Sequence, residues 1–256
     1  MKIASWNVNS LNVRLPHVLS WLEQSPMDVL GLQETKLIDE KFPKEAIEEA
    51  GYEVAYSGQP TYNGVAILSK YPLDDIITDP PNVTDEHRRI IAATVNGVRV
   101  INLYVVNGKA VGDEKYSYKL DWLKRVSDWI ETEMAQYENV VVMGDFNIAP
   151  ADADIHDPEQ WRDKILCSDA ERAALQRILD MGLTDTYRKF EQAPESYSWW
   201  DYRQAGFRRN LGLRIDLVLA SDGLLNKCTT SVIDKIPRTW ERPSDHAPVW
   251  AEFIDI

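Results

Sequence analysis

Short apolar runs rich in β-branched residues recur along the whole chain, and they constrain its fold more than any other feature of the sequence. Runs of this length and composition, bounded by polar and turn-forming residues, predict strands rather than helices. They are Lys2–Trp6, Val29–Leu32, Val65–Leu68, Ile90–Val95, Val98–Val105, Val140–Met143, Ile215–Ala220 and Val249–Ile254.

Helical patterns lie between these runs. The longest extends from Glu114 to Gln136, where apolar residues recur at spacings of three and four. A second begins at Ser168, whose pairing with Glu171 forms a capping box, and stops at Gly182. Strands and helices that alternate over the full length predict one α/β domain, residues 1–256, with buried sheets.

Polar residues stand where the predicted strands end. The run Val140–Val142 should be buried on both faces, and it leads into Asp145 and Asn147. These two residues are two positions apart, so they point to the same side if the strand continues. Similar polar ends occur at Asn7 and Asn9, Glu34, Tyr104 and Asn107, Asp216, and Asp245-His246.

Each polar end has a plain structural interpretation. Asn7 and Asn9 are typical turn residues, Asp216 could protect an edge strand from aggregation, and Asp245-His246 could be a loop pair. Five or more such ends in one chain, however, are what a convergent active site at one edge of a sheet requires.

The residue types at these ends suit the hydrolysis of a phosphate ester. Glu34 offers hard oxygen ligands for Mg²⁺ (or Mn²⁺), and no cluster of Cys and His indicates zinc. Asp145 could orient or deprotonate a water, and His246 held by Asp216 could donate charge-assisted hydrogen bonds to an oxyanion. Neutral donors for phosphoryl oxygens come from Asn7, Tyr104 and Asn147.

Composition excludes few function classes. With 28 Lys+Arg and 41 Asp+Glu the net charge is −13, which argues against a sequence-independent nucleic-acid coat but not against a nuclease with a local basic groove. No run is long enough for a membrane span, no signal peptide is apparent, and there are only 2 cysteines. We therefore expect a soluble protein of a reducing, cytoplasmic compartment, and nothing demands more than a monomer.

Five segments together resemble the motif set of the exonuclease III family, which belongs to the deoxyribonuclease I-like superfamily. They are IASWNVNSLN, LGLQETK, GDFNIAP, GLRIDLVLAS and RPSDHAPVW, in that order over nearly the whole chain. The resemblance implies a four-layered α/β sandwich, in which two packed mixed β-sheets are flanked by helices. It also implies Mg²⁺-dependent hydrolysis of duplex DNA at 3′ ends and nicks and 5′ to abasic sites, and removal of 3′-phosphates.

The resemblance also implies roles for individual residues. Glu34 would be the principal metal ligand, with Asn7 close by, Asn9 lining the metal site and Asp245 helping to hold the ion. Asp145 would align or deprotonate the water, and His246, oriented by Asp216, would contact a phosphoryl oxygen. The scissile phosphate would be bound by Asn147 and Tyr104.

The segment from Tyr197 to Asn210, called the basic aromatic segment below, is rich in tryptophan, tyrosine and arginine. Aromatic and cationic side chains alternate there, which suits a loop that stacks on sugars or bases while arginines bind phosphates. The alternative is a hydrophobic strand followed by a solvated basic turn. In the family this region lies near the lesion, which implies DNA contacts for Trp199, Tyr202, Arg203, Arg208 and Arg209, together with Asn107 from the earlier loop.

The loop after Asn147 should overhang the site. We hypothesise that His156 narrows the pocket and favours terminal 3′ groups over an extruded abasic sugar. The alternative is that His156 caps the loop through Asp157.

Two other functions remain open from the sequence. One is a superfamily phosphatase acting on a phospholipid or an inositol phosphate, or a sphingomyelinase, although the basic aromatic segment favours DNA. The other is a non-catalytic DNA- or metal-binding module, against which the intact set of polar strand ends argues.

Overall fold

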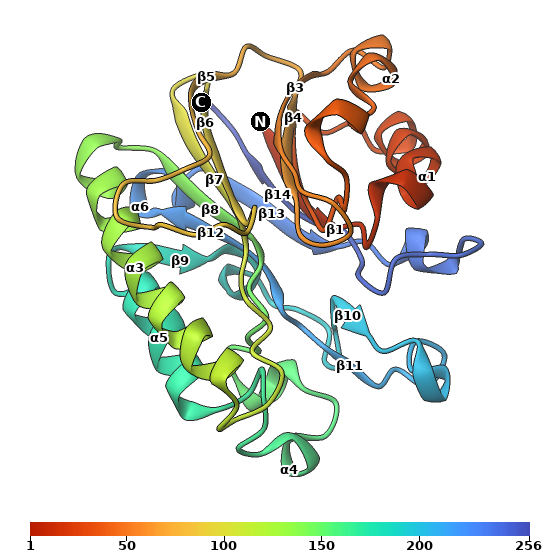
Figure 1. The fold of residues 1–256 in the computed structure, drawn as a ribbon, viewed down its shortest axis with the longest axis vertical. Helices are drawn as coiled ribbons and strands as arrows, with labels where there is room; N and C mark the ends of the chain where they lie inside the picture. The colour runs from red at the N-terminus through yellow and green to blue at the C-terminus, as the bar shows by residue number, and fades with distance from the viewer.

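The computed structural model describes residues 1–256 as two six-stranded sheets packed face to face, with helices on both outer faces (Figure 1). The first sheet has the strand order β13-β14-β1-β2-β4-β3, and β1 runs parallel to β2 while the other pairs are antiparallel. Its strands are β13 (Cys228–Ile233), β14 (Val249–Phe253), β1 (Lys2–Asn7), β2 (Val29–Gln33), β4 (Val65–Ser69) and β3 (Glu53–Ser57).

The second sheet has the order β5-β6-β7-β8-β12-β9, and here only β7 and β8 are parallel. Its strands are β5 (Asp74–Ile77), β6 (Ile90–Val95), β7 (Val98–Tyr104), β8 (Val140–Asp145), β12 (Asp216–Ser221) and β9 (Leu183–Asp185). A two-stranded ribbon, β10 (Trp199–Trp200) with β11 (Gly212–Leu213), projects beside the sheets.

Three apolar layers hold the sandwich together. The inner faces of the sheets meet in one core, to which β4 contributes Ile67 and β8 contributes Val141 and Met143. A second core lies under α1 (Leu11–Gln24) and α2 (Lys44–Glu49), and a third under α3 (Glu114–Gln136) and α5 (Asp169–Leu179). Two further helices are short: α4 (Pro158–Trp161) lies between β8 and α5, and α6 (Asp222–Leu225) lies between β12 and β13. The predicted four-layered α/β sandwich is confirmed.

Most predicted elements match the structure. The helix α3 has the predicted bounds, and α5 begins with the predicted capping box, in which Ser168 and Glu171 bond each other's backbone N–H groups. The predicted bounds of the strand Ile215–Ala220 are wrong by one residue, because β12 spans Asp216–Ser221. The edge-strand interpretation of Asp216 is also wrong, because β12 lies between β8 and β9.

The topology brings the polar strand ends to one edge of the sandwich. The parallel strands β1 and β2 end side by side at Asn7 and Gln33, and β7 and β8 end side by side at Tyr104 and Asp145. The antiparallel strand β12 begins opposite Asp145, at Asp216. Both sheets therefore place polar residues at the same edge of the sandwich.

None of the helices has the length and apolar character that a membrane span requires.

Candidate active site

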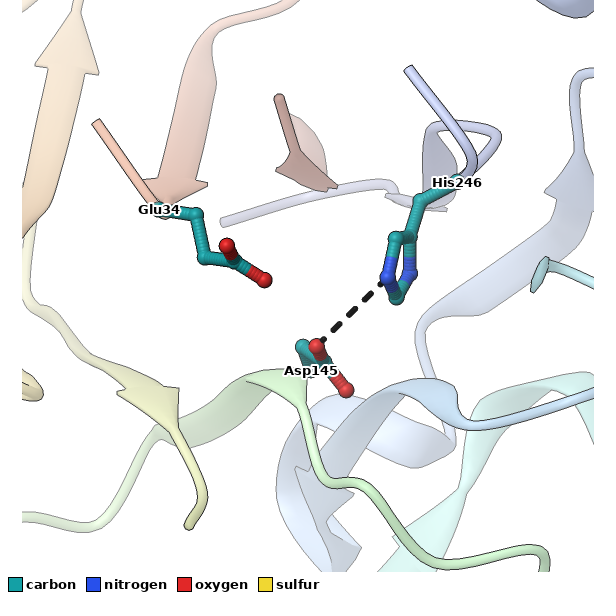
Figure 2. A group of neighbouring side chains, drawn as sticks. All are labelled: Glu34, Asp145 and His246. Carbon is teal, nitrogen blue, oxygen red and sulfur yellow. Dashed lines mark ion pairs between the residues drawn. The ribbon is translucent and has the colours of Figure 1, made fainter. Parts of the chain in front are cut away.

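Glu34, Asp145 and His246 meet at this edge of the sandwich. They come from the end of β2, the end of β8 and the segment before β14, and one possible ligand atom from each lies within 4.8 Å of the others. Figure 2 shows the three side chains converging, with the imidazole of His246 directed at the carboxylate of Asp145. The distance from His246 Nε2 to Asp145 Oδ2 is 3.7 Å.

Asp145 is buried at the centre of this group. Its Oδ2 accepts a hydrogen bond from Asn7 Nδ2 at 2.8 Å, and its Oδ1 accepts one from the backbone N–H of Asn147 at 2.9 Å. Burial raises the pKa of Asp145; His246 opposes this shift and the carboxylates of Asp216 and Glu34 add to it, so that the pKa is about 7. Asp145 can therefore exchange a proton near neutral pH.

Glu34 lies just beyond β2 with a left-handed backbone, at φ 53°. Its Oε1 accepts a hydrogen bond from Asn7 Nδ2 at 2.9 Å, so the amide of Asn7 bridges the carboxylates of Glu34 and Asp145. Lys36, which the sequence reasoning did not single out, places its Nζ 3.2 Å from Glu34 Oε2. Its only sequence signal was its position two residues after Glu34.

His246 is held by a carboxylate on its other side. Its Nδ1 lies 2.9 Å from Asp216 Oδ2, and the hydroxyl of Ser198 donates to the same oxygen at 2.7 Å. Burial alone would lower the pKa of His246, but Asp216 and Asp145 outweigh it and raise the pKa to about 10. The imidazole is therefore a cation at neutral pH, with Nε2–H facing Asp145.

Asn147 and Tyr104 complete the inner wall. The strand does not continue to Asn147: it ends at Asp145, and Asn147 has φ 48°. The turn still returns its side chain to the site, where Nδ2 donates to Val105 O at 2.9 Å and Oδ1 accepts from Asn107 Nδ2 at 3.3 Å. Burial and the carboxylates of Glu34 and Asp145 raise the pKa of Tyr104, which keeps its hydroxyl protonated.

Asn9 and Asp245 lie beside the three converging residues and are linked to Glu34 through Lys36. Asp245 Oδ1 accepts from Asn9 Nδ2 at 3.0 Å, and its Oδ2 accepts from Trp199 Nε1 at 3.0 Å. Asn9 Oδ1 in turn accepts from Lys36 Nζ at 2.6 Å. Both oxygens of Asp245 are thus bonded to neutral donors, and Asp245 lies outside the group of possible metal ligands.

The polar residues line a pocket of about 310 Å³. Trp199 and Arg203 of the basic aromatic segment lie in its wall, with Asp201, which the sequence reasoning did not select. The loop after Asn147 supplies three further apolar side chains that it also missed: Trp161, Ile165 and Leu166.

The rest of the basic aromatic segment is a short ribbon and an exposed turn. Trp200 is fully buried, whereas Tyr202 is exposed and donates its hydroxyl to Pro243 O at 2.7 Å. Arg208 and Arg209 are exposed on the turn between β10 and β11. Cationic and aromatic groups therefore flank the pocket, but only part of the segment reaches it.

His156 does not line this pocket. It lines a neighbouring cavity of about 340 Å³, and Trp161 and Trp199 are walls of both spaces. Its Nδ1 lies 3.1 Å from Gly212 O, while Asp157 caps α4 instead by accepting from Gln160 N. This placement contradicts both expectations. His156 does not narrow the pocket itself, and Asp157 caps α4 rather than holding His156.

The chain is similar to known proteins in both sequence and fold. The chain matches the model of the Endonuclease/Exonuclease/phosphatase family over residues 4–246, which include every side chain that converges on the pocket. The chain belongs to this family. Exodeoxyribonuclease III of Haemophilus influenzae is 39% identical to it, in an alignment covering 99% of this chain and 100% of that protein.

Solved structures of this family superpose closely on the chain. A Neisseria 3′ phosphatase, NExo, solved with a product DNA hairpin, is 50% identical with a TM-score of 0.97 over 99% of each chain. An AP endonuclease from Archaeoglobus fulgidus is 36% identical with a TM-score of 0.96 over 100% of each. The predicted membership of the exonuclease III family is confirmed, and the chain is a hydrolytic nuclease.

Proposed function

We propose that this nuclease is a Mg²⁺-dependent DNA-repair phosphodiesterase with one catalytic centre, which hydrolyses duplex DNA at 3′ ends and nicks and 5′ to abasic sites. The observation that carries the proposal is the convergence of Glu34, Asp145 and the His246–Asp216 pair at one end of a pocket. Such an enzyme would work in the cytoplasm on the nucleoid, and the pocket is complete within one chain.

The donor set fits a hard divalent cation. The carboxylates of Glu34 and Asp145 face each other, and the amide of Asn7 orients both of them. His246 presents an N–H rather than a lone pair, because Asp216 and Asp145 keep it protonated. We therefore assign Glu34 as the principal ligand, beside the carboxylate of Asp145. The bound ion would neutralise negative charge on the phosphate.

Asp145 is the residue we assign as the general base. It is buried, its pKa is close to neutrality, and the backbone N–H of Asn147 and the amide of Asn7 fix the orientation of its carboxylate. Asp216 and Asp145 raise the pKa of His246 to about 10, which favours the protonated imidazole at neutral pH and makes His246 the weaker candidate for accepting the water's proton. A proton taken from the attacking water therefore goes to Asp145.

The phosphate is held by donors on the other walls. His246, charged and fixed by Asp216, can give a charge-assisted hydrogen bond to the phosphoryl oxygen that gains charge. Asn147 and Tyr104 add neutral donors, and the raised pKa of Tyr104 keeps its proton available. His246 and Asn147 are held by hydrogen bonds to Asp216 and to Val105 O before substrate arrives, so these two side chains need little reorganisation in the transition state.

The exposed arginines beside the pocket would hold the DNA backbone. We expect the double substitution Arg208→Gln with Arg209→Gln to raise KM for duplex DNA several-fold and to leave kcat within twofold, because neither side chain lines the pocket. If both arginines contact phosphates, the dependence of log(kcat/KM) on log[salt] becomes shallower by about 2. An unchanged salt dependence would show that the DNA follows another path.

The choice between substrates would depend on the loop after Asn147. Trp161 stands between the pocket and the neighbouring cavity, so we expect Trp161→Ala to widen the pocket and to raise abasic incision relative to 3′-end processing several-fold. His156→Gly is the matched control, since His156 lines the neighbouring cavity but not the pocket, and the ratio should change less than twofold. A larger effect from His156→Gly than from Trp161→Ala would restore His156 as the selective residue.

Metal dependence and substrate class can be tested in one experiment. The protein, stripped with chelator, is incubated with a 3′-phosphate duplex or with a phosphatidylinositol phosphate vesicle, with and without added Mg²⁺. We expect turnover of the duplex with Mg²⁺ alone. Turnover of the lipid in place of DNA would indicate the phosphatase alternative, and binding without turnover would indicate a non-catalytic module.

A further inference from the structure

Lys119 is a fully buried lysine outside the catalytic pocket that reaches the backbone of two pocket residues. It lies on α3, and its Nζ donates to Asn147 O at 2.6 Å and to Asn107 O at 3.2 Å. The third acceptor is the buried carboxylate of Glu171 on α5. The ammonium group thus donates its three hydrogen bonds to the loop after β7, the loop after β8 and the helix α5.

Glu171 extends this connection to the outer wall of the pocket. Its Oε1 also accepts from the backbone N–H of Leu166 at 3.1 Å, and its Oε2 accepts from the N–H and the hydroxyl of Ser168. Leu166 lines the pocket. The Lys119–Glu171 pair therefore joins three backbone segments that contribute residues to the pocket.

The backbone at these points needs such support. Asn147 has φ 48°, a conformation that costs a non-glycine residue free energy and persists when the surroundings fix it. Gly108, at φ 89°, brings the loop after Asn107 against the stem of Lys119, since a Cβ added there would lie 3.0 Å from Lys119 Cδ. The side chain of Lys119 is thus packed on one side and fully bonded at its end.

Burial of an ammonium group is costly, and burial lowers the pKa of Lys119 while Glu171 raises it. An apolar side chain of the same length would fill this space without that cost. The ammonium group of Lys119, unlike an apolar end, fixes the positions of the carbonyl groups of Asn107 and Asn147.

We propose that Lys119, held by Glu171, is a positioning residue for catalysis: it fixes the loops that carry Asn107 and Asn147, and with them the N–H that orients Asp145. The proposal rests on the proposed function, in which Asn147 binds the scissile phosphate and Asp145 is the base. Lys119 itself does not touch the substrate.

The same fold contains a matched control. Arg99 on β7 and Glu133 near the end of α3 form a second buried ion pair, which bonds the carbonyl of Asp75 and no residue of the pocket. Loss of either cation leaves a buried carboxylate without its partner, so Lys119→Met and Arg99→Met should both lower the Tm.

The test compares kcat and KM of the wild type, Lys119→Met and Arg99→Met on a 3′-phosphate duplex, well below the lowest Tm. Because a displacement of about 1 Å can cost about 10²-fold in rate, we expect Lys119→Met to lower kcat 30- to 100-fold, with KM within threefold. Arg99→Met should keep kcat within twofold of the wild type.

Equal kcat values for the two variants would overturn the proposal, because Lys119 would then act on stability alone. If Lys119→Met does not fold, Glu171→Gln is compared with Glu133→Gln, and a kcat loss confined to Glu171→Gln supports the proposal while equal values overturn it. An inactive wild type would instead refute the proposed function.

Discussion

The substitution Asp145→Asn should lower kcat on a 3′-phosphate duplex by about 10²- to 10⁴-fold, the contribution typical of a general base. The amide has the same shape as the carboxylate and can still accept from the backbone N–H of Asn147. It cannot take a proton from water. The loss should therefore appear in kcat, measured at saturating DNA, rather than in the affinity for DNA.

Two measurements show whether such a loss has this cause. DNA affinity, measured by fluorescence anisotropy in Ca²⁺ or chelator, should stay within threefold of the wild type. We expect little net change in Tm: the neutral amide avoids the cost of burying a charge, but it loses the attraction to His246 and the hydrogen bond from Asn7. Retention of more than a tenth of the wild-type kcat would contradict the role of Asp145 as base.

The second large effect is expected at Glu34. Glu34→Gln removes the carboxylate charge that we assign as the principal metal ligand but keeps an oxygen that can accept from Asn7. Since hard cations prefer charged oxygen ligands, we expect the Mg²⁺ concentration for half-maximal rate to rise at least tenfold, with kcat falling about 10²-fold at physiological Mg²⁺. The measurement is a Mg²⁺ titration of the initial rate.

Asp245→Asn provides the comparison for that titration. The sequence resemblance implies a metal-binding role for Asp245, but both of its oxygens accept hydrogen bonds from Asn9 and Trp199. We expect its half-saturating Mg²⁺ concentration to shift less than threefold. A larger shift for Asp245→Asn than for Glu34→Gln would contradict the assignment of Glu34 as the principal ligand.

The sequence predicted the inner strands and the residues at their ends because burial constrains both. The β8 strand is buried on both faces and so reads as a continuous apolar run, which makes Asp145 at its end conspicuous. The edge strand β5 has three exposed residues out of four, and β3 alternates between buried and less buried residues, so neither gives a continuous apolar run. The helix α1 was missed because Pro16 and several polar residues interrupt its apolar face.

Residues that act through tertiary contacts were not predicted. Lys119 looks like any polar residue of a long amphipathic helix, and only the packing of α3 against the loops after β7 and β8 shows that it is buried. Trp161 and Ile165 follow a loop whose path no periodicity determines. The misplacement of His156 has the same cause: closeness to Asn147 in sequence does not fix which cavity a loop residue lines.

The most direct test of the central claim is a parallel rate measurement on three labelled duplexes, with Mg²⁺ and with chelator. One duplex carries an internal abasic site, one a recessed 3′-hydroxyl and one a 3′-phosphate at a nick. Because one catalytic centre is proposed for all three reactions, every rate should require Mg²⁺, and Asp145→Asn should lower each of them by a similar factor. A reaction that persists in chelator, or that Asp145→Asn leaves intact, would contradict the account.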